Sequence, residues 1–395
     1  MNIVENTSAR VVLKPGREKS IYNRHPWLFS GAVEKLDGRA KAGDVVPVYA
    51  AKGEFLGKGF WNPHSAIRVR LLTFQQETVD VQFFRARLQN ALALRKMLIG
   101  TDTNAFRLVN SDGDLLSGLI VDQYDDTLVI QCTSSGMQLH KPMLIDLLKE
   151  LCNPAQILER SEGNALRNEG LQPVIEWLLG GETPMVDIIE NGLKFRVDVK
   201  GGQKTGFFLD QRGNRELTGK FAAGKSLLNC FSYSGAFSVY AAVNGATTTS
   251  VDISEPAIAL AKENFKLNDL PTKSHDFLAA NVFDYLREDD ARFDMIVLDP
   301  PAFVKQKAHI DKGARGYKDI NRLAIQKLNP GGLLLTCSCS AYVDRDLFRK
   351  IIYSAAQEVG RDCRILAQPA QPADHPINIF HPEGEYLKTL LLQVD

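Results

Sequence analysis

The sequence has no long apolar run, no low-complexity tract and no secretory signal pattern. No apolar stretch approaches the roughly 20 residues that a membrane helix needs, so we expect no membrane-spanning segment. The first ten residues, MNIVENTSAR, lack the charged-then-apolar pattern of a signal peptide. We therefore expect a cytosolic, globular protein, and a length of 395 residues favours two or three domains.

The six cysteines do not indicate a disulfide framework, because such frameworks are rare in large cytosolic chains. Cys337 and Cys339 form a C-x-C pair, but no second cysteine or histidine pair follows at the spacing of a zinc site. We therefore expect no metal.

The formal net charge is zero, which by itself does not favour a nucleic-acid-binding protein. The charge is unevenly distributed, however: residues 1–75 contain 12 Lys and Arg against 6 Asp and Glu, and the remainder is acidic. This asymmetry is expected when one domain contacts phosphate groups and another performs the chemistry. An ordinary solvated surface would explain the charges equally well.

Residues 1–76 alternate short β-like runs with Gly and Pro turns, which predicts a small β-barrel or sandwich. Aromatic and basic residues lie close together here, and that combination binds unpaired RNA. We select Arg24 and Trp27 as substrate-binding candidates. The alternative is that the aromatic residues, Phe60 and Trp61 among them, form the core of a small domain.

Residues 77–189 are predicted to form a small α+β domain. The segment at 79–100 has the apolar periodicity of an amphipathic helix, and further strands and a second helix follow it. Asp112 and Asp122 are interpreted as turn and surface residues. This domain therefore has no predicted catalytic group, and its role would be positional or in substrate binding.

Residues 190–395 are predicted to form the catalytic domain. The run MVDIIENGLKFRVDV (185–199) is interpreted as one strand that leads into the loop GGQKTGFFLDQRGNR (201–215). The loop is either a plain linker or a cover for a ligand, because adjacent phenylalanines in a polar segment need an apolar partner. In the second case Phe208 and Gln211 would contact the ligand.

Apolar runs alternate with helical segments from Ser226 onward, which favours an α/β fold with a doubly wound, Rossmann-like parallel sheet. Ligands in such sheets bind at the carboxyl ends of the strands. The run FSYSGAFS (231–238) follows the first strand, and its small residues, Ser234 and Gly235, let the backbone approach a ligand. Because this run is not G-x-G-x-x-G, a dinucleotide is disfavoured.

Two further polar residues follow neighbouring strands of the predicted sheet. Asp252 ends the second strand, where an acidic side chain contacts ribose hydroxyls, although a plain loop residue is the alternative. Asn281 follows the third strand and is our candidate for the adenine edge, although a turn asparagine would look identical in sequence.

Asp299, Pro300 and Pro301 end the fourth strand, FDMIVLD. The prolines cannot donate hydrogen bonds to a sheet, so they stop the strand and hold the aspartate in a rigid turn. A carboxylate accepts a hydrogen bond from the exocyclic amine of cytosine but repels the carbonyl of uracil, which favours a cytosine base. Pro300, Pro301 and Lys305 are the substrate contacts that we predict beside Asp299.

Cys339 is the candidate nucleophile. It lies near the carboxyl end of the last apolar strand, beyond Cys337 and hence nearer the ligand crevice. Carbon-5 of cytosine accepts a methyl group only after a thiolate has added to C6, whereas methylation of nitrogen or oxygen needs no thiolate. The alternative is that both cysteines are small core residues, and that interpretation is favoured for Cys337.

The chain resembles the bacterial 23S ribosomal RNA cytosine-C5 methyltransferases over nearly its whole length. Each motif is weak alone, but the set and its order are specific: HPWLFSGA, RLVNSDGDLLSGLIVDQY, KTGFFLDQR, FSYSGAFS, DPPAFVK, RGYKDINR and SCS. The resemblance implies a PUA domain, a middle α+β domain and a Rossmann-like catalytic domain. It also implies S-adenosylmethionine as cofactor and cytosine 1962 of 23S rRNA as the target, converted to 5-methylcytosine.

The resemblance also implies roles for particular residues. Ser234, Gly235 and Asp252 would bind the cofactor, Asp299 would contact the base, and the nucleophile would lie seven residues after Gly332, at Cys339. Two departures stand out. Asn281 occupies a position where such enzymes usually have aspartate. Ala302 follows the motif proline where relatives often have a second cysteine, so the product must be released without that thiol.

Two other interpretations stay open at this point. A guanine-N7 or other nitrogen methyltransferase would keep its activity in a Cys339→Ala variant. A non-catalytic RNA-binding or assembly factor with this fold would fail to bind S-adenosylmethionine. The sequence leaves both a monomer and a homodimer open, and it identifies no general base.

Overall fold

The computed structural model describes residues 8–181, 183–288 and 290–395. The chain folds into two compact units. The first unit consists of Met1–Asn191, Val197–Leu209 and Ala373–Gly384, and the second of Gly192–Arg196, Asp210–Pro372 and Glu385–Asp395. The finer division at residues 76 and 189 stays a prediction.

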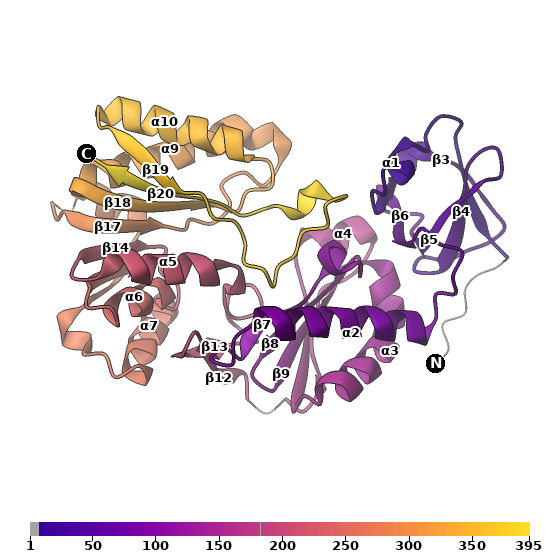
Figure 1. The fold of residues 1–395 in the computed structure, drawn as a ribbon, viewed down its shortest axis with the longest axis horizontal. Helices are drawn as coiled ribbons and strands as arrows, with labels where there is room; N and C mark the ends of the chain where they lie inside the picture. Colours follow the sequence, from indigo (N-terminus) through magenta and orange to yellow (C-terminus); the bar gives the residue numbers. More distant parts are fainter. Residues whose placement is uncertain (1–7, 182, 289) are drawn as a thin grey trace. The chain divides into compact units, whose positions relative to one another are not determined.

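The first unit begins with a six-stranded sheet of order β2-β6-β5-β4-β1-β3 (Figure 1). Its strands are β1 (Arg10–Leu13), β2 (Trp27–Phe29), β3 (Val33–Asp37), β4 (Val45–Tyr49), β5 (Phe55–Trp61) and β6 (Ile67–Thr73), with a short α1 (Lys19–Tyr22) after β1. Phe60 and Trp61 are buried, so these two aromatic residues belong to the core. The Phe60 ring stacks on that of Phe84, with 6.2 Å between the ring centroids.

A second sheet in the first unit has the order β11-β10-β9-β8-β7. It comprises β7 (Ala105–Asn110), β8 (Leu119–Tyr124), β9 (Thr127–Cys132), β10 (Gln156–Ser161) and β11 (Val174–Leu179). Helices α2 (Val81–Leu98), α3 (Ser135–Cys152) and α4 (Asn164–Glu169) accompany it, so the amphipathic helix predicted at 79–100 is confirmed as α2. Asp80 begins α2 by accepting a hydrogen bond from the Phe83 N–H at 3.0 Å.

Our interpretation of Asp112 and Asp122 as surface residues is wrong, because both are buried. Asp122 accepts two hydrogen bonds from the Arg107 guanidinium, at 2.8 and 3.0 Å, and a third from the Thr205 hydroxyl at 2.6 Å. Asp112 accepts from the indole N–H of Trp27 at 3.1 Å. Buried carboxylates require such partners, and turn-forming sequence patterns describe the backbone rather than the direction of a side chain.

The single strand expected at 185–199 is instead a hairpin of β12 (Met185–Glu190) and β13 (Leu193–Asp198). Asn191 and Gly192 connect the two strands, with φ of 50° and 77°. Asn-Gly is the preferred pair for a two-residue turn with positive φ at both positions. The Asn-Gly pair therefore is a sequence signal for the turn, although the apolar residues on both sides of it favour a single continuous strand.

The second unit contains a seven-stranded sheet of order β16-β15-β14-β17-β18-β20-β19. Its strands are β14 (Ser226–Cys230), β15 (Thr247–Asp252), β16 (Asp276–Ala279), β17 (Phe293–Leu298), β18 (Leu328–Ser338), β19 (Cys363–Ala367) and β20 (Lys388–Val394). The pairs from β16 to β18 are all parallel, which confirms the Rossmann-like sheet. Strand β20 is antiparallel to both of its neighbours, which the sequence analysis did not predict.

Helices cover both faces of this sheet (Figure 1). Helices α5 (Arg212–Ala222), α6 (Ala236–Ala242) and α7 (Glu255–Leu267) lie on one face, and α8 (Val282–Glu288), α9 (Ile310–Lys327) and α10 (Arg345–Val359) on the other. Two apolar cores result, one under each helical layer. The strand order reverses between β14 and β17, and the crevice at the carboxyl ends of such strands is where doubly wound sheets bind ligands.

None of the helices in the described part of the chain is long and apolar enough to cross a membrane. Within the same residues, no group of three or more His, Cys, Asp or Glu side chains is arranged to hold a metal ion.

Candidate active site

The loop after β14 has an unusual backbone at the carboxyl edge of the sheet. Phe231, Tyr233 and Gly235 have φ of 58°, 45° and 74°. Two of these are non-glycine residues in the left-handed region, where a bulky side chain is costly and strain often marks a functional site. The Ser232 hydroxyl is buried and has no hydrogen-bond partner among the described residues. The loop therefore presents a buried hydroxyl that lacks a hydrogen-bond partner at the carboxyl ends of the strands.

Asp252 ends β15 next to this loop and is almost fully buried. Its two carboxylate oxygens accept hydrogen bonds from the Tyr233 N–H and the Ser254 N–H, both at 2.9 Å. Ser254 in turn begins α7, because its hydroxyl accepts from the Ala257 N–H at 3.3 Å. Backbone donors therefore orient Asp252 at the strand end.

Asn281 lies after β16, where the sequence analysis expected the adenine contact, and it is exposed. Its side-chain carbonyl accepts from the backbone N–H groups of Phe283 at 2.8 Å and Asp284 at 3.4 Å, at the start of α8. The Asn281 oxygen is therefore engaged with the helix. The adenine contact stays a prediction.

Gln211 lies close to Cys337, at the centre of a buried polar cluster. The pKa of the Cys337 thiol is raised well above its usual range, first by burial and next by the Asp299 carboxylate, while hydrogen bonds from Thr389 and Gln211 oppose the shift. The Gln211 side-chain oxygen accepts from Asn214 at 2.5 Å, and Asn214 also donates to Thr389 at 3.1 Å. Cys337 is thus held as a neutral thiol inside the domain.

Asp299 follows the last residue of β17, and Cys339 follows the last residue of β18, its parallel neighbour in the sheet. Pro300 is buried, whereas Pro301 and Lys305 are exposed in the loop that follows Asp299. Cys339 is partly exposed, whereas Cys337 is fully buried. The two strand ends therefore bring a carboxylate and an accessible thiol to the same edge of the sheet.

Ser340, which follows Cys339, forms hydrogen bonds with the loop after Asp299 and with α9. Its hydroxyl accepts from the Val304 N–H at 3.1 Å and lies 2.9 Å from the hydroxyl of Tyr317, which is fully buried in α9. Burial raises the pKa of Tyr317. Tyr317 comes from the RGYKDINR motif, to which the sequence analysis assigned no role. It connects the loop after Asp299 to the residue that follows Cys339.

The remaining predicted contacts lie in the first unit. Phe208 is partly exposed, and the Lys204 ammonium lies 4.4 Å from its ring centroid. Arg24 is exposed, and its guanidinium lies over the Phe74 and Phe380 rings at 5.1 and 5.3 Å. The Trp27 ring centroid lies 5.2 Å from the Arg70 guanidinium and 4.3 Å from the centroid of the His381 ring. Part of the Trp27 surface is therefore already covered.

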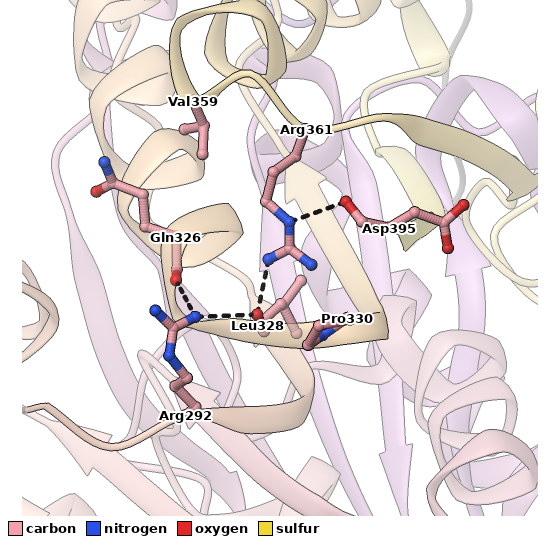
Figure 2. A pocket seen from close by; sticks show the side chains of 7 residues that line it. All are labelled: Arg292, Gln326, Leu328, Pro330, Val359, Arg361 and Asp395. Carbon is pink, nitrogen blue, oxygen red and sulfur yellow. Dashed lines mark hydrogen bonds between the residues drawn. The ribbon is translucent and has the colours of Figure 1, made fainter.

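A pocket of about 590 Å³ lies at the amino ends of the parallel strands of the second unit's sheet, opposite the ends that carry Asp299 and Cys339 (Figure 2). Arg292 donates to the Gln326 carbonyl at 3.0 Å, and Arg361 donates to the Leu328 carbonyl at 2.7 Å and the Asp395 carbonyl at 3.1 Å. These guanidinium groups bind main-chain carbonyls where β18 begins and β20 ends. They close the amino end of the sheet and contribute nothing to the edge that carries Cys339.

Lys388 is the residue at the carboxyl edge that the sequence analysis missed. It begins β20, is 4% exposed, and pairs with Ser338, the last residue of β18. The available signal was a single lysine at the head of an apolar strand, LKTLLLQV. Only the pairing of the two strands places this lysine beside the cysteine.

Comparison with known proteins defines the class. A model for S-adenosylmethionine-dependent methyltransferases matches residues 162–376, and a model for PUA-like domains matches residues 11–74. A structure from Streptococcus mutans, described as a candidate S-adenosylmethionine-dependent methyltransferase, is 27% identical, with a TM-score of 0.83 over 97% of this chain and 99% of that one. SMU.776, a candidate methyltransferase crystallised with S-adenosylhomocysteine, has a TM-score of 0.84 at the same identity and coverage. The chain belongs to the S-adenosylmethionine-dependent methyltransferases, with a PUA-like domain at its amino-terminal end.

Curated relatives identify the family within this class of methyltransferases. The ribosomal RNA large subunit methyltransferase I of Tolumonas auensis is 46% identical over 98% of this chain and 99% of that relative. The proteins of the same name from Alteromonas mediterranea and Shewanella amazonensis are each 44% identical, over 98% of this chain and 99% and 100% of theirs. The chain is a member of the ribosomal RNA large subunit methyltransferase I family, and the predicted resemblance is confirmed.

The residues at the carboxyl edge fit the cofactor of this family. The unpartnered Ser232 hydroxyl and the Asp252 carboxylate can bind the polar hydroxyls of an adenosine. Gly235 keeps the turn between them open, because a side chain there would strain a backbone with φ of 74°. Bound S-adenosylmethionine supplies an electrophilic methyl group on a sulfonium.

Replacement of Gly235 by alanine tests how tightly this turn is built. A Cβ at this position would lie 2.7 Å from the Ala261 Cβ in α7, in addition to the cost of positive φ. We expect the free energy of unfolding in urea to fall by about 2–4 kcal/mol. Gly245→Ala is the matched control, because its φ is 85° but no atom lies within 4 Å of the added Cβ. Equal losses in the two variants would contradict the packing argument.

Proposed function

We propose that the protein makes 5-methylcytosine in 23S ribosomal RNA, at the family target cytosine 1962, with Cys339 as covalent nucleophile. The family membership supports ribosomal RNA as the substrate, because the relatives are named for it. The basic amino-terminal 75 residues and the PUA-like domain support binding to RNA. The expected setting is the cytosol.

One observation carries the choice of carbon over nitrogen as the methyl acceptor. A partly exposed cysteine lies one residue beyond β18, and Asp299 lies one residue beyond the neighbouring parallel strand β17. Methylation of an exocyclic or ring nitrogen needs no thiol at this place, whereas methylation of carbon-5 does. Cys337 is unsuited to the role, because burial raises the pKa of its thiol.

The proposed reaction begins when the base is flipped out of its stack and reaches the crevice. The Cys339 thiolate adds to C6, forming a carbon–sulfur bond, and the electron pair of the C5–C6 double bond becomes available at C5. C5 takes the methyl group, so the sulfonium of the cofactor becomes a neutral thioether. The C5 proton then passes to solvent or to a basic group. The C6–sulfur bond breaks, the double bond re-forms, and the thiolate is regenerated.

A first set of residues would bind and orient the cofactor. Asp252 accepts hydrogen bonds from ribose hydroxyls, and the backbone at Ser234 and Gly235 borders the cofactor. Asn281 contacts the adenine. Gln211 and Phe208 complete the cofactor contacts that we propose.

A second set of residues would hold the RNA. Asp299 accepts from the exocyclic amine of cytosine and also borders the methyl donor. Pro300, Pro301 and Lys305 flank the flipped base, while Arg24 and Trp27 contact the RNA from the first unit.

RNA fragments that contain 5-fluorocytidine at the target position test this proposal. Fluorine cannot leave as a proton, so the reaction should stop at the adduct in which Cys339 is bonded to C6. We expect a protein–RNA band on a denaturing gel that forms only with S-adenosylmethionine and maps to the peptide containing Cys339.

The same fragment with unmodified cytidine is the control and should be methylated without leaving a stable band. If this fragment is methylated but the fluorinated one gives no adduct, the cytosine-C5 assignment is wrong and a nitrogen acceptor takes its place. A failure to bind S-adenosylmethionine would instead favour a non-catalytic RNA-binding protein.

A further inference from the structure

Lys388 is a buried lysine next to the proposed nucleophile. It pairs across the antiparallel ladder with Ser338, and Cys339 follows Ser338 directly. Its side chain is almost completely enclosed, with 4% of the residue exposed. A lysine is rarely buried to this extent unless its ammonium group has partners that compensate for the lost water.

The ammonium group has two such partners, and both are uncharged. Lys388 Nζ donates to the main-chain carbonyl of Ser340 and to that of Tyr386, each at 2.7 Å. The first of these carbonyls belongs to the residue immediately after Cys339. In the part of the chain that the structure describes, Lys388 forms no ion pair with a carboxylate. Its positive charge is therefore hydrogen-bonded but is not neutralised by a direct partner.

Cys339 contributes most to stabilising the positive charge of Lys388. Burial lowers the pKa of Lys388 to about 8, and the interaction with Cys339 is the largest of the contributions that raise it. Glu385 and Asp344 raise the Lys388 pKa by smaller amounts, whereas Arg345 lowers it. Among the described residues, Asp344, Arg345 and Glu385 interact electrostatically with Lys388, and Tyr317 and Cys337 with Cys339, while Asp299 acts on Cys337.

We propose that Lys388 is a positioning residue for Cys339: its ammonium group favours the thiolate form of the cysteine, and its bond to the Ser340 carbonyl holds the peptide that follows it. This inference rests on the proposed role of Cys339 as nucleophile. A thiolate is far more nucleophilic than a thiol, and a neighbouring cation increases the thiolate fraction at neutral pH. The effect ends when the proton leaves the lysine.

Lys388 takes no part in the proton transfers of the proposed reaction. The thiolate is consumed when the carbon–sulfur bond forms at C6 and is regenerated when that bond breaks, while the ammonium group keeps its three protons. The role is therefore electrostatic and geometric, and it is needed at both covalent steps. It also gives a reason for a lysine at the first position of a strand whose other members are mostly apolar.

The test measures the reactivity of the Cys339 thiol in the full chain, without RNA. Alkylation by iodoacetamide is followed across pH 5 to 10 by mass spectrometry of the peptide that contains Cys339. Lys388→Gln removes the charge but keeps an N–H donor, whereas Lys388→Arg keeps the charge. We expect Lys388→Gln to move the pH of half-maximal alkylation upward by about one unit or more, and Lys388→Arg to leave it near the wild-type value. Lys350→Gln, on the exposed surface of α10, should change nothing.

A Lys388→Gln profile identical to that of the wild type would overturn the proposal. If this variant does not fold, the reciprocal measurement replaces it, because coupling between two sites acts in both directions. The lysine side-chain resonance of Lys388 is then titrated by NMR in the wild type and in Cys339→Ala. The proposal predicts a lower titration midpoint in Cys339→Ala, and an unchanged midpoint contradicts it.

Failure of this proposal about Lys388 can be distinguished from failure of the proposed cysteine mechanism. Alkylation reports the state of the thiol whether or not the thiol is used on RNA. A shifted profile together with full methylation by Cys339→Ala would uphold the coupling and overturn the cysteine mechanism. An unshifted profile together with a trapped 5-fluorocytidine adduct would do the reverse.

Discussion

Replacing Cys339 by alanine should abolish methyl transfer to the RNA, with a loss in kcat of at least about a thousandfold. The reason is chemical: carbon-5 of cytosine attacks a methyl group only after a nucleophile has added to C6, and alanine offers none. Binding of S-adenosylmethionine should be unchanged, because Cys339 follows β18, whereas the residues that we propose to border the cofactor are the loop after β14 and Asp252 at the end of β15. The measurement is single-turnover methylation with labelled cofactor, alongside calorimetric titration of the cofactor.

Cys337→Ala is the matched control for this prediction. The two cysteines are separated by one residue, but Cys337 is fully buried, and its sulfur lies 3.5 Å from the Thr389 hydroxyl. We expect this variant to lose stability, by about 1–2 kcal/mol, and to keep its rate within a factor of about three. If Cys339→Ala methylates normally, or if the two variants exchange behaviour, the assignment of the nucleophile is wrong.

Asp299→Asn should both slow the reaction and weaken its discrimination between bases. A carboxylate can only accept hydrogen bonds, so it matches the exocyclic amine of cytosine and repels the uracil carbonyl. An asparagine side chain can either accept or donate. Because a hydrogen bond to a charged group contributes about 1.5–3 kcal/mol, we expect kcat/KM with cytosine to fall by roughly 10- to 150-fold. The preference over the same RNA with uridine at the target should shrink in parallel.

Asp294→Asn provides the comparison, at the other end of the strand that precedes Asp299. Asp294 lies near the amino end of β17, where its carboxylate accepts from the Ser226 N–H at 2.9 Å and from Asn329 at 2.7 Å. We expect this variant to lose stability and to keep its preference for cytosine. The measurement is competitive methylation of cytidine- and uridine-containing fragments. An unchanged base preference in Asp299→Asn would contradict the proposed contact.

Most elements of the second unit could be predicted from sequence, because each is defined by a local pattern. The strands at 226–230 and 293–298 are short apolar runs, and Asp299-Pro300-Pro301 stops the second of them by the chemistry of proline. A serine followed two residues later by a proline is a local signal for a helix start, and the Ser254 hydroxyl caps α7. The strand ends that carry the candidate residues follow from these patterns.

The errors arose where a side chain finds its partner far away in the sequence. The turn signals around Asp122 predict a surface residue, but its side chain is buried against Arg107 and Thr205. For Phe60 and Trp61 the sequence left two interpretations open, stacking on bases and burial in a core, and the structure shows that they are core residues. Composition and spacing indicate which residues can bind a base or a charge, and only packing decides whether they are accessible.

The sequence by itself therefore determined the class of fold, the strands of the parallel part of the catalytic sheet, the cofactor of the family and the identity of the candidate nucleophile. The tertiary structure decided the surroundings of that nucleophile. Lys388 and Ser340 are 48 residues apart, and they meet because β20 enters the sheet antiparallel to β18. Tyr317 reaches Ser340 from a helix on one face of the sheet. Such contacts depend on strand register and layer packing, which are set by the whole buried core and leave no local pattern to recognise.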